Sequence, residues 1–139
     1  MRRKKVGNKK VLLITNSSDL GEDVLRHGIN LSKRMDAGLE VLHLVTAPQA
    51  KQAAEHFQAL VAAMEPAEPL PYSQFVGQGE FVGEALDYAR NKRNLLCVIL
   101  YPDSDGGRER QGKGQRRFKE VMQMLNCPVV VYSGSPVYL

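Results

Sequence analysis

Every residue from Leu95 to Tyr101 is hydrophobic, and this run constrains the fold more than any other feature of the chain. A continuous apolar run, as opposed to an alternating one, predicts a strand covered on both faces, as in a parallel sheet. A glycine-rich basic loop, 102–115, a short amphipathic helix and a second strand, 128–132, follow it. Strand, loop, helix and strand in this order are the layout of a nucleotide site.

The rest of the chain repeats this alternation of strand and helix patterns. Hydrophobic runs predict strands at 10–15 and 39–45, and a weaker pattern predicts another at 72–76. Helical periodicity predicts four helices: one from Ser18 as its N-cap to Gly38 as its C-terminal stop, one from Pro48 to Pro66, one over about 81–92, and one with an apolar stripe at 118, 121, 122 and 125.

Five strands alternating with four helices predict a doubly wound α/β domain. Right-handed crossovers between such elements give a mainly parallel, five-stranded sheet with helices on both faces. Ligands of these domains bind beyond the carboxyl ends of the strands, where the winding of the sheet reverses. We expect this point between strands 10–15 and 95–101, so that the turn Asn16-Ser17-Ser18 faces the 102–115 loop across a crevice.

Length and composition indicate one domain, 10–139, after a basic tail, 1–9. The chain has 139 residues and is 43% hydrophobic, which suits a single core. Cys97 and Cys127 lie in or beside apolar runs, which predicts reduced thiols in a cytosolic protein. The apolar run after the basic start is too short for a signal peptide, and none is long enough to span a membrane. We therefore expect a cytoplasmic protein with no membrane insertion.

Basic residues are concentrated in two segments, although the net charge is only +4. Residues 2–10 hold six Lys and Arg and no acid, and residues 108–119 hold six more against one acid, Glu109. The remaining residues include seven basic and fourteen acidic ones. An acidic body with two short basic segments argues against nucleic acid as a partner. The tail is expected to be a disordered, solubilising terminus.

Several short segments, in this order and spacing, resemble the universal stress protein family from Lys10 to Tyr132. The strand at 11–15 and the turn after it resemble the family's first strand and Asp-Gly-Ser turn, with Asn16 in place of the usual Asp. Segments 42–45 and 79–89 resemble its second strand and its third loop and helix, and Cys127-Pro128-Val129-Val130-Val131 resembles the start of its last strand.

The resemblance implies a fold and an assembly. The fold is that of the adenine nucleotide alpha hydrolases, with strand order 3-2-1-4-5. The assembly is a homodimer, commonly formed through the last strand, and the corresponding residues here are Val129, Val130, Val131 and Tyr132. Their β-branched content suits a sheet that continues across a twofold axis.

The glycine motif that ATP-binding members of this family carry is missing. That motif is Gly-x-x-Gly, nine residues, then Gly-Ser or Gly-Thr, and its backbone N–H groups cradle phosphates. Counting back from Pro128 places its positions at Pro102, Asp105, Gln115 and Arg116, and none matches. The glycines present, at 106, 107, 112 and 114, include no pair three residues apart.

The altered loop favours one of two predicted functions over the other. Proline offers no N–H, and Asp103 and Asp105 would repel a triphosphate, so we do not expect ATP binding in the manner of this family. The resemblance then implies a stress-response or signalling module that acts through contacts with an unidentified protein and is not an enzyme. The alternative is that ATP or another adenine nucleotide binds in the crevice. Its candidate contacts are Thr15, Asn16 and Ser17 near the base and ribose, and Gly112, Gly114 and Arg116 near the phosphates. The basic loop is either such an anion site or, as we favour, a solvated loop.

Other motifs carry less information. Gly77-Gln78-Gly79 with Gly83 departs from the dinucleotide fingerprint by one residue and is interpreted as a tight turn. Flavin binding is a remote alternative because the chain is only 6% aromatic, and the acid pair of a receiver domain is absent. The spacing of the three histidines does not suit a metal site, and His43, in an apolar strand, is expected to be a hydrogen-bonded core residue.

Overall fold

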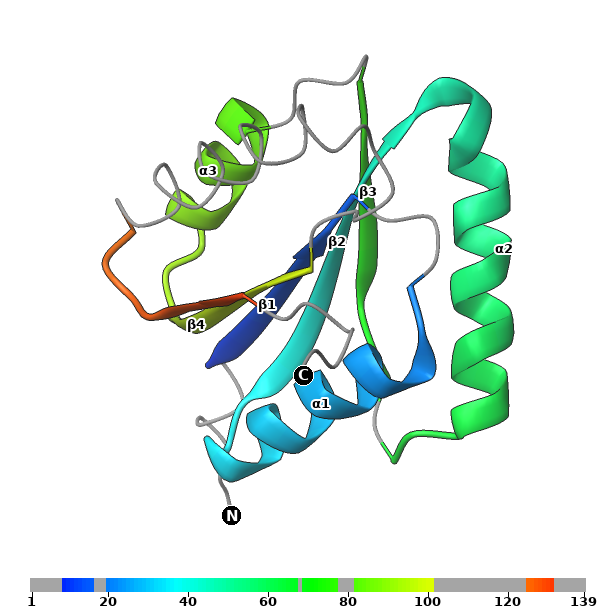
Figure 1. The fold of residues 1–139 in the computed structure, drawn as a ribbon. Helices are drawn as coiled ribbons and strands as arrows, with labels where there is room; N and C mark the ends of the chain where they lie inside the picture. Colours follow the sequence, from blue (N-terminus) through cyan, green and yellow to red (C-terminus); the bar gives the residue numbers. More distant parts are fainter. Residues whose placement is uncertain (1–8, 17–19, 68, 78–81, 102–124, 132–139) are drawn as a thin grey trace, which may run out of the picture.

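The computed structural model describes residues 9–16, 20–67, 69–77, 82–101 and 125–131. Its elements in chain order are β1 (Lys10–Thr15), α1 (Glu22–Arg34), β2 (Gly38–Thr46), α2 (Ala47–Met64), β3 (Tyr72–Gly77), α3 (Val82–Arg90), β4 (Leu95–Tyr101) and β5 (Val129–Val131). The strands form one sheet in the order β3-β2-β1-β4-β5, and every pair in it is parallel (Figure 1). The predicted fold class and strand order are confirmed.

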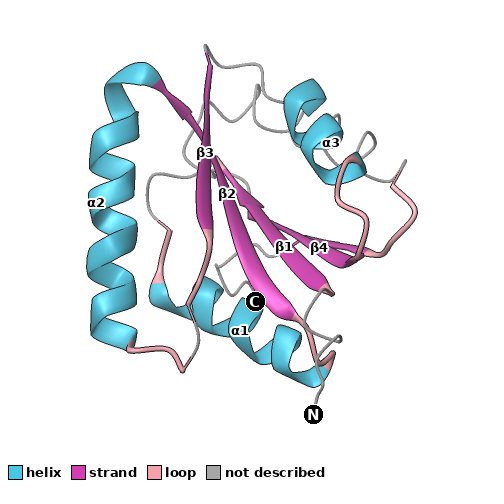
Figure 2. Cartoon of the chain, turned by 180° about the vertical axis from the view of Figure 1, so that it is seen from behind, coloured by secondary structure: helices cyan, strands magenta, loops and turns pink. Residues whose placement is uncertain are grey.

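The sheet separates two layers of hydrophobic core. Alternate residues of a strand point to opposite faces, so Val11 and Leu13 of β1 pack toward α1 and α2, while Leu12 and Ile14 pack toward α3. Figure 2 shows α3 on the side of the sheet away from α1 and α2. Because both faces of the central strands are covered, their sequences are continuous apolar runs.

Both predicted ends of the first helix are wrong. The helix begins at Glu22 with Gly21 at the N-cap, and not after Ser18. It ends at Arg34, and Gly38 is the first residue of β2 instead of a helix stop. The chain turns at Asp36, whose φ of 57° is left-handed. Aspartate tolerates this conformation better than most residues, so a glycine is not required there.

The second helix follows its predicted signals more closely. Thr46 is the N-cap, and its hydroxyl donates to Oε1 of Gln49 over 3.0 Å, while Pro48 lies in the first turn, where its missing N–H costs nothing. The helix ends at Met64, and Glu65 takes a left-handed φ of 49° just before Pro66. The connection to β3 therefore begins where the sequence predicts.

The predicted fourth helix, apart from Leu125, lies outside the described residues, as does Tyr132 of the predicted last strand. Leu125 packs against the core layer on the α3 side. Among the helices that the structure describes, none has the length and hydropathy of a membrane span.

Candidate functional site

The carboxyl ends of β1 and β4 lie side by side where the winding of the sheet reverses. The two strands pair in parallel, with Thr15 opposite Tyr101 at their ends. In doubly wound sheets this position is where ligands bind. The switch point of the sheet therefore lies between the two strands for which the sequence predicts it.

Thr15 holds the two strand ends together. Its side chain is fully buried, and Oγ1 donates a hydrogen bond to the main-chain carbonyl of Tyr101 over 2.8 Å. This bond crosses from β1 to β4, so the hydroxyl serves the sheet at the position that was predicted to contact a base or ribose. Asn16, the next residue, is half-buried and directly follows the end of β1.

The structure brings together only part of the predicted nucleotide site. Thr15 and Asn16 lie at the crevice. Ser17, Gly112, Gly114 and Arg116 lie outside the described residues, as does the whole 102–117 loop. Of the predicted nucleotide contacts, the structure therefore describes only Thr15 and Asn16, at the end of β1, and the predicted phosphate contacts remain a prediction from the sequence.

A buried ionic cluster that the sequence analysis missed lies toward the other end of the sheet, on the side of α3. Glu40 of β2 is only 6% exposed. Its Oε2 accepts a hydrogen bond from the hydroxyl of Tyr88 and lies 2.9 Å from Nζ of Lys92. The ammonium of Lys92 also lies 4.7 Å from the centre of the Tyr88 ring, a cation–π distance. The sequence signal that could have indicated this cluster is Glu40 itself, the one acidic residue in a mostly apolar strand.

The cluster keeps its two charges. Burial by itself would raise the pKa of Glu40, but the hydrogen bond from Tyr88 and the bond and charge of Lys92 outweigh it, so this pKa lies below its ordinary value. The hydrogen bond to Glu40 also raises the pKa of Lys92. The pair is thus ionised at neutral pH and links β2 to the segment after α3.

His43 is a hydrogen-bonded core residue, as predicted. It is 1% exposed, and its Nδ1 lies 2.8 Å from the hydroxyl of Tyr72 on β3. Gln74 donates to the same hydroxyl over 3.0 Å and to the carbonyl of Ala50 over 2.8 Å. The Tyr72 ring stacks on Phe57 of α2 with 4.2 Å between centroids. This network joins β2, β3 and α2.

The other described side chains that could bind a metal ion do not form a cluster with one another. His56 donates from Nε2 to the carbonyl of Leu20 over 2.7 Å, which fastens α2 to the segment before α1. In the part of the chain that the structure describes, no three His, Cys, Asp or Glu side chains lie close enough to hold a metal ion. Cys97 and Cys127 are free thiols, and burial raises the pKa of each.

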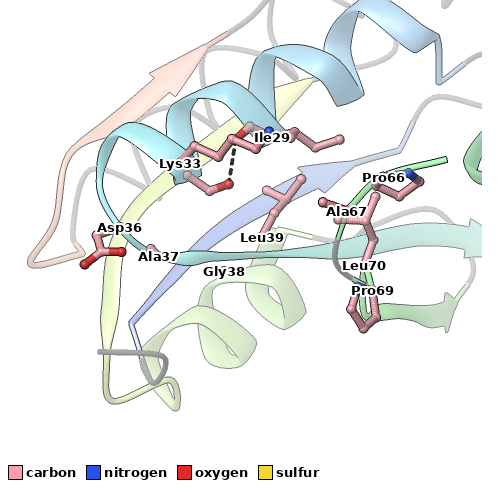
Figure 3. Close-up of a pocket in the computed structure, with 11 residues that line it drawn as sticks. Ile29, Lys33, Asp36, Ala37, Gly38, Leu39, Pro66, Ala67, Pro69 and Leu70 are labelled. Atoms are coloured by element: carbon pink, nitrogen blue, oxygen red, sulfur yellow. Dashed lines mark hydrogen bonds between the residues drawn. The ribbon is translucent and has the colours of Figure 1, made fainter. Parts of the chain in front are cut away.

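A hollow of about 310 Å³, the α1–β2 hollow, lies at the amino end of β2. Figure 3 shows Leu39 standing between α1 and the residues that follow α2, among them Pro66 and Leu70. The charged residues at this hollow are Lys33 and Asp36, and the hydroxyl of Ser32 is already bonded to the carbonyl of Ile29 over 2.8 Å. The α1–β2 hollow is at the opposite ends of the strands from the crevice, and its walls are mainly apolar.

Comparison with known proteins supports the fold. No family model matches the chain, and no curated protein matches it. Among solved structures, the universal stress protein UspA from Lactobacillus plantarum is similar, with a TM-score of 0.58 and 18% identity over 91% of this chain and 99% of that one. At this identity the similarity concerns the fold. The chain therefore has the α/β fold of a universal stress protein, with the strand order 3-2-1-4-5.

Proposed function

We propose that this protein is a cytoplasmic stress-response or signalling module that acts through protein contacts and has no catalytic turnover. Its universal stress protein-like fold supports the general assignment. The free thiols of Cys97 and Cys127 are in keeping with a reducing compartment. The protein contacts rest on one observation, which is the exposed edge of the sheet at β5.

Two large hydrophobic side chains are exposed on β5. Val130 is 39% exposed and Val131 is 45% exposed, on a strand that pairs only with β4 among the described strands. An edge strand with β-branched side chains readily pairs with another strand. The proposed first contact is therefore a second copy of the chain, in which two β5 strands continue the sheet across a twofold axis.

A matched pair of edge variants tests this homodimer. We expect the wild-type protein to be a dimer at micromolar concentration by size-exclusion chromatography with light scattering. Val131→Lys should give a monomer, because a charge at the paired edge opposes association. Val76→Lys is the control, since Val76 is 47% exposed on β3 at the opposite edge. A monomeric wild type, or loss of the dimer in both variants, would contradict the proposal.

Nucleotide binding in the crevice is the second candidate function. Its support is the position of Thr15 and Asn16 at the β1–β4 switch point. Against it stands the loop sequence, with Pro102 and Asp105 at two positions where an ATP-binding loop needs glycine, and with Asp103 adding a second negative charge beside them. We therefore propose that the crevice does not bind ATP in the manner of the glycine-motif proteins.

A thermal-shift titration separates the two candidates. A ligand that binds only the folded state raises the melting temperature by mass action. We expect no shift with millimolar ATP and magnesium. A clear shift that Arg116→Ala weakens would instead establish the nucleotide-binding function, with Arg116 at the phosphates.

A further inference from the structure

A second pocket, of about 300 Å³, lies at the amino end of β4 and is here called the α3–β4 pocket. The end of α3, the turn into β4 and residues 125–127 form its walls. Figures 1 and 2 both show the segment that leads into β5 beside the connection from α3 to β4. The pocket is at the opposite ends of the strands from the crevice, so an inference about it does not depend on the proposed function.

The lining of the α3–β4 pocket is positively charged. Arg90, Lys92 and Arg93 line it, and none of the described lining residues is acidic. The α1–β2 hollow has one lysine and one aspartate, and a third hollow, on α1, has two acids and one arginine. Counting the described lining residues of these three hollows, the α3–β4 pocket alone has basic side chains and no acid.

Two of the three charges are left for a ligand. Nζ of Lys92 lies 2.9 Å from the buried carboxylate of Glu40, which compensates its charge. Within the described residues, Arg90 and Arg93 make no ion pair, and both residues are exposed. Lys92 is thus held in place as part of the wall, and no acid among the described residues competes with an anion for the two guanidinium groups.

The other wall residues suit a polar anion. Asn126 offers an amide with two N–H donors. Burial raises the pKa of Cys127, so its thiol is uncharged at neutral pH and does not repel a negative group. The planar fork of an arginine side chain donates two parallel hydrogen bonds to a phosphate or a carboxylate.

We propose that the α3–β4 pocket binds a small phosphorylated ligand, with Arg90 and Arg93 holding its phosphate group. A phosphate monoester carries between about 1.5 and 2 negative charges near neutral pH, which matches the two guanidinium groups that no described acid compensates. A single carboxylate would balance only one of them. Asn126 donates to a remaining phosphate oxygen or to a polar group of the ligand.

The test is a titration of the full chain with glycerol 2-phosphate, followed by ¹H–¹⁵N NMR at constant ionic strength. Glycerol at the same concentrations is the phosphate-free control. We expect saturable shifts for the amides of Arg93, Asn126 and Cys127 with the phosphate ester and none with glycerol. Shifts confined to residues 2–10 or 108–119 would overturn the proposal, since the anion would then bind one of the other basic segments.

Charge-matched double variants provide the second measurement. Arg90→Gln with Arg93→Gln should raise the dissociation constant at least tenfold, because charge-assisted hydrogen bonds are lost. Lys33→Gln with Arg34→Gln, at the end of α1, and Lys4→Gln with Lys5→Gln, in the basic tail, each remove the same charge and should leave it within about twofold. Equal weakening in all three variants would mean general charge attraction and would overturn the proposal, as would no binding to the wild type.

Discussion

The hydroxyl of Thr15 donates a hydrogen bond of 2.8 Å to the carbonyl of Tyr101, and so joins the last residues of the two strands between which the sheet reverses its winding. Both strands are central in the sheet order, and Thr15 is fully buried. The contact ties the ends of β1 and β4 together at the switch point of the sheet. We therefore expect a substitution at Thr15 to change the free energy of unfolding, whether or not a ligand binds nearby.

Thr15→Val should destabilise the protein by about 1 to 2 kcal/mol, because valine keeps the shape of threonine but cannot donate to the Tyr101 carbonyl. The measurement is urea unfolding. Thr15→Ser is the control and should retain part of the lost stability, since it keeps a hydroxyl. Equal stability of Thr15→Val and the wild type would show that the hydrogen bond contributes little.

Stability should fall in acid through Glu40. Its folded pKa lies below the ordinary value of 4.5, so the ionised group stabilises the fold above that value and this contribution is lost as the pH falls through the folded pKa. Glu40→Gln should flatten the decline in stability below about pH 5 and cost about 1 to 3 kcal/mol at neutral pH. Urea unfolding at several pH values measures both effects.

Lys92 affects the pH dependence of stability at the alkaline end of the range. Its folded pKa is raised above 10.5, so its contribution is complete below that value and is lost as the pH rises through the folded pKa. Lys92→Met should therefore remove the part of alkaline destabilisation that depends on this pair. An unchanged alkaline limb in Lys92→Met would count against the ion pair with Glu40.

Two helical glycines should respond differently to substitution. A Cβ on Gly28 would lie 3.2 Å from both δ carbons of Leu39, whereas a Cβ on Gly83 would meet nothing within 4 Å. Gly83→Ala should therefore stabilise the protein by about 0.5 to 1 kcal/mol through helix propensity. Gly28→Val should destabilise it by about 1 to 3 kcal/mol through overpacking of α1 against β2. Thermal and urea unfolding of both variants test the contrast, and a destabilised Gly83→Ala would contradict it.

Tyr72→Phe should destabilise the protein by about 1 to 2 kcal/mol. Phenylalanine keeps the stacking on Phe57 but leaves Nδ1 of His43 without the hydroxyl 2.8 Å away. Tyr72→Leu removes the ring stacking as well and should cost more. Urea unfolding compares the two variants, and a Tyr72→Phe protein as stable as the wild type would show that the hydroxyl is dispensable.

Long-range contacts explain which parts of the site were predictable. Thr15 and Asn16 could be placed at the switch point of the sheet because the carboxyl ends of parallel strands share one edge of a sheet. The Glu40 cluster could not be found, because its partners Tyr88 and Lys92 follow 48 and 52 residues later and belong to the neighbourhood of another helix. The residues next to an acidic side chain in a strand do not indicate whether that side chain forms an ion pair in the folded protein.

The sequence by itself predicted the strands and the burial of His43, because continuous apolar runs require cover on both faces. The strand order was implied by the resemblance to a known family, and the structure has the same order. The tertiary structure decided where α1 begins and ends. Ser18 and Gly21 can each serve as an N-cap, and Asp36 can follow the end of a helix in the left-handed conformation, so the local sequence does not fix either end. Packing of the helix on the sheet selects among these residues. The tertiary structure also decided which charges are compensated, because the partners of a charge are brought together only by folding. Lys92 is paired with Glu40, whereas no described residue forms an ion pair with Arg90 or Arg93.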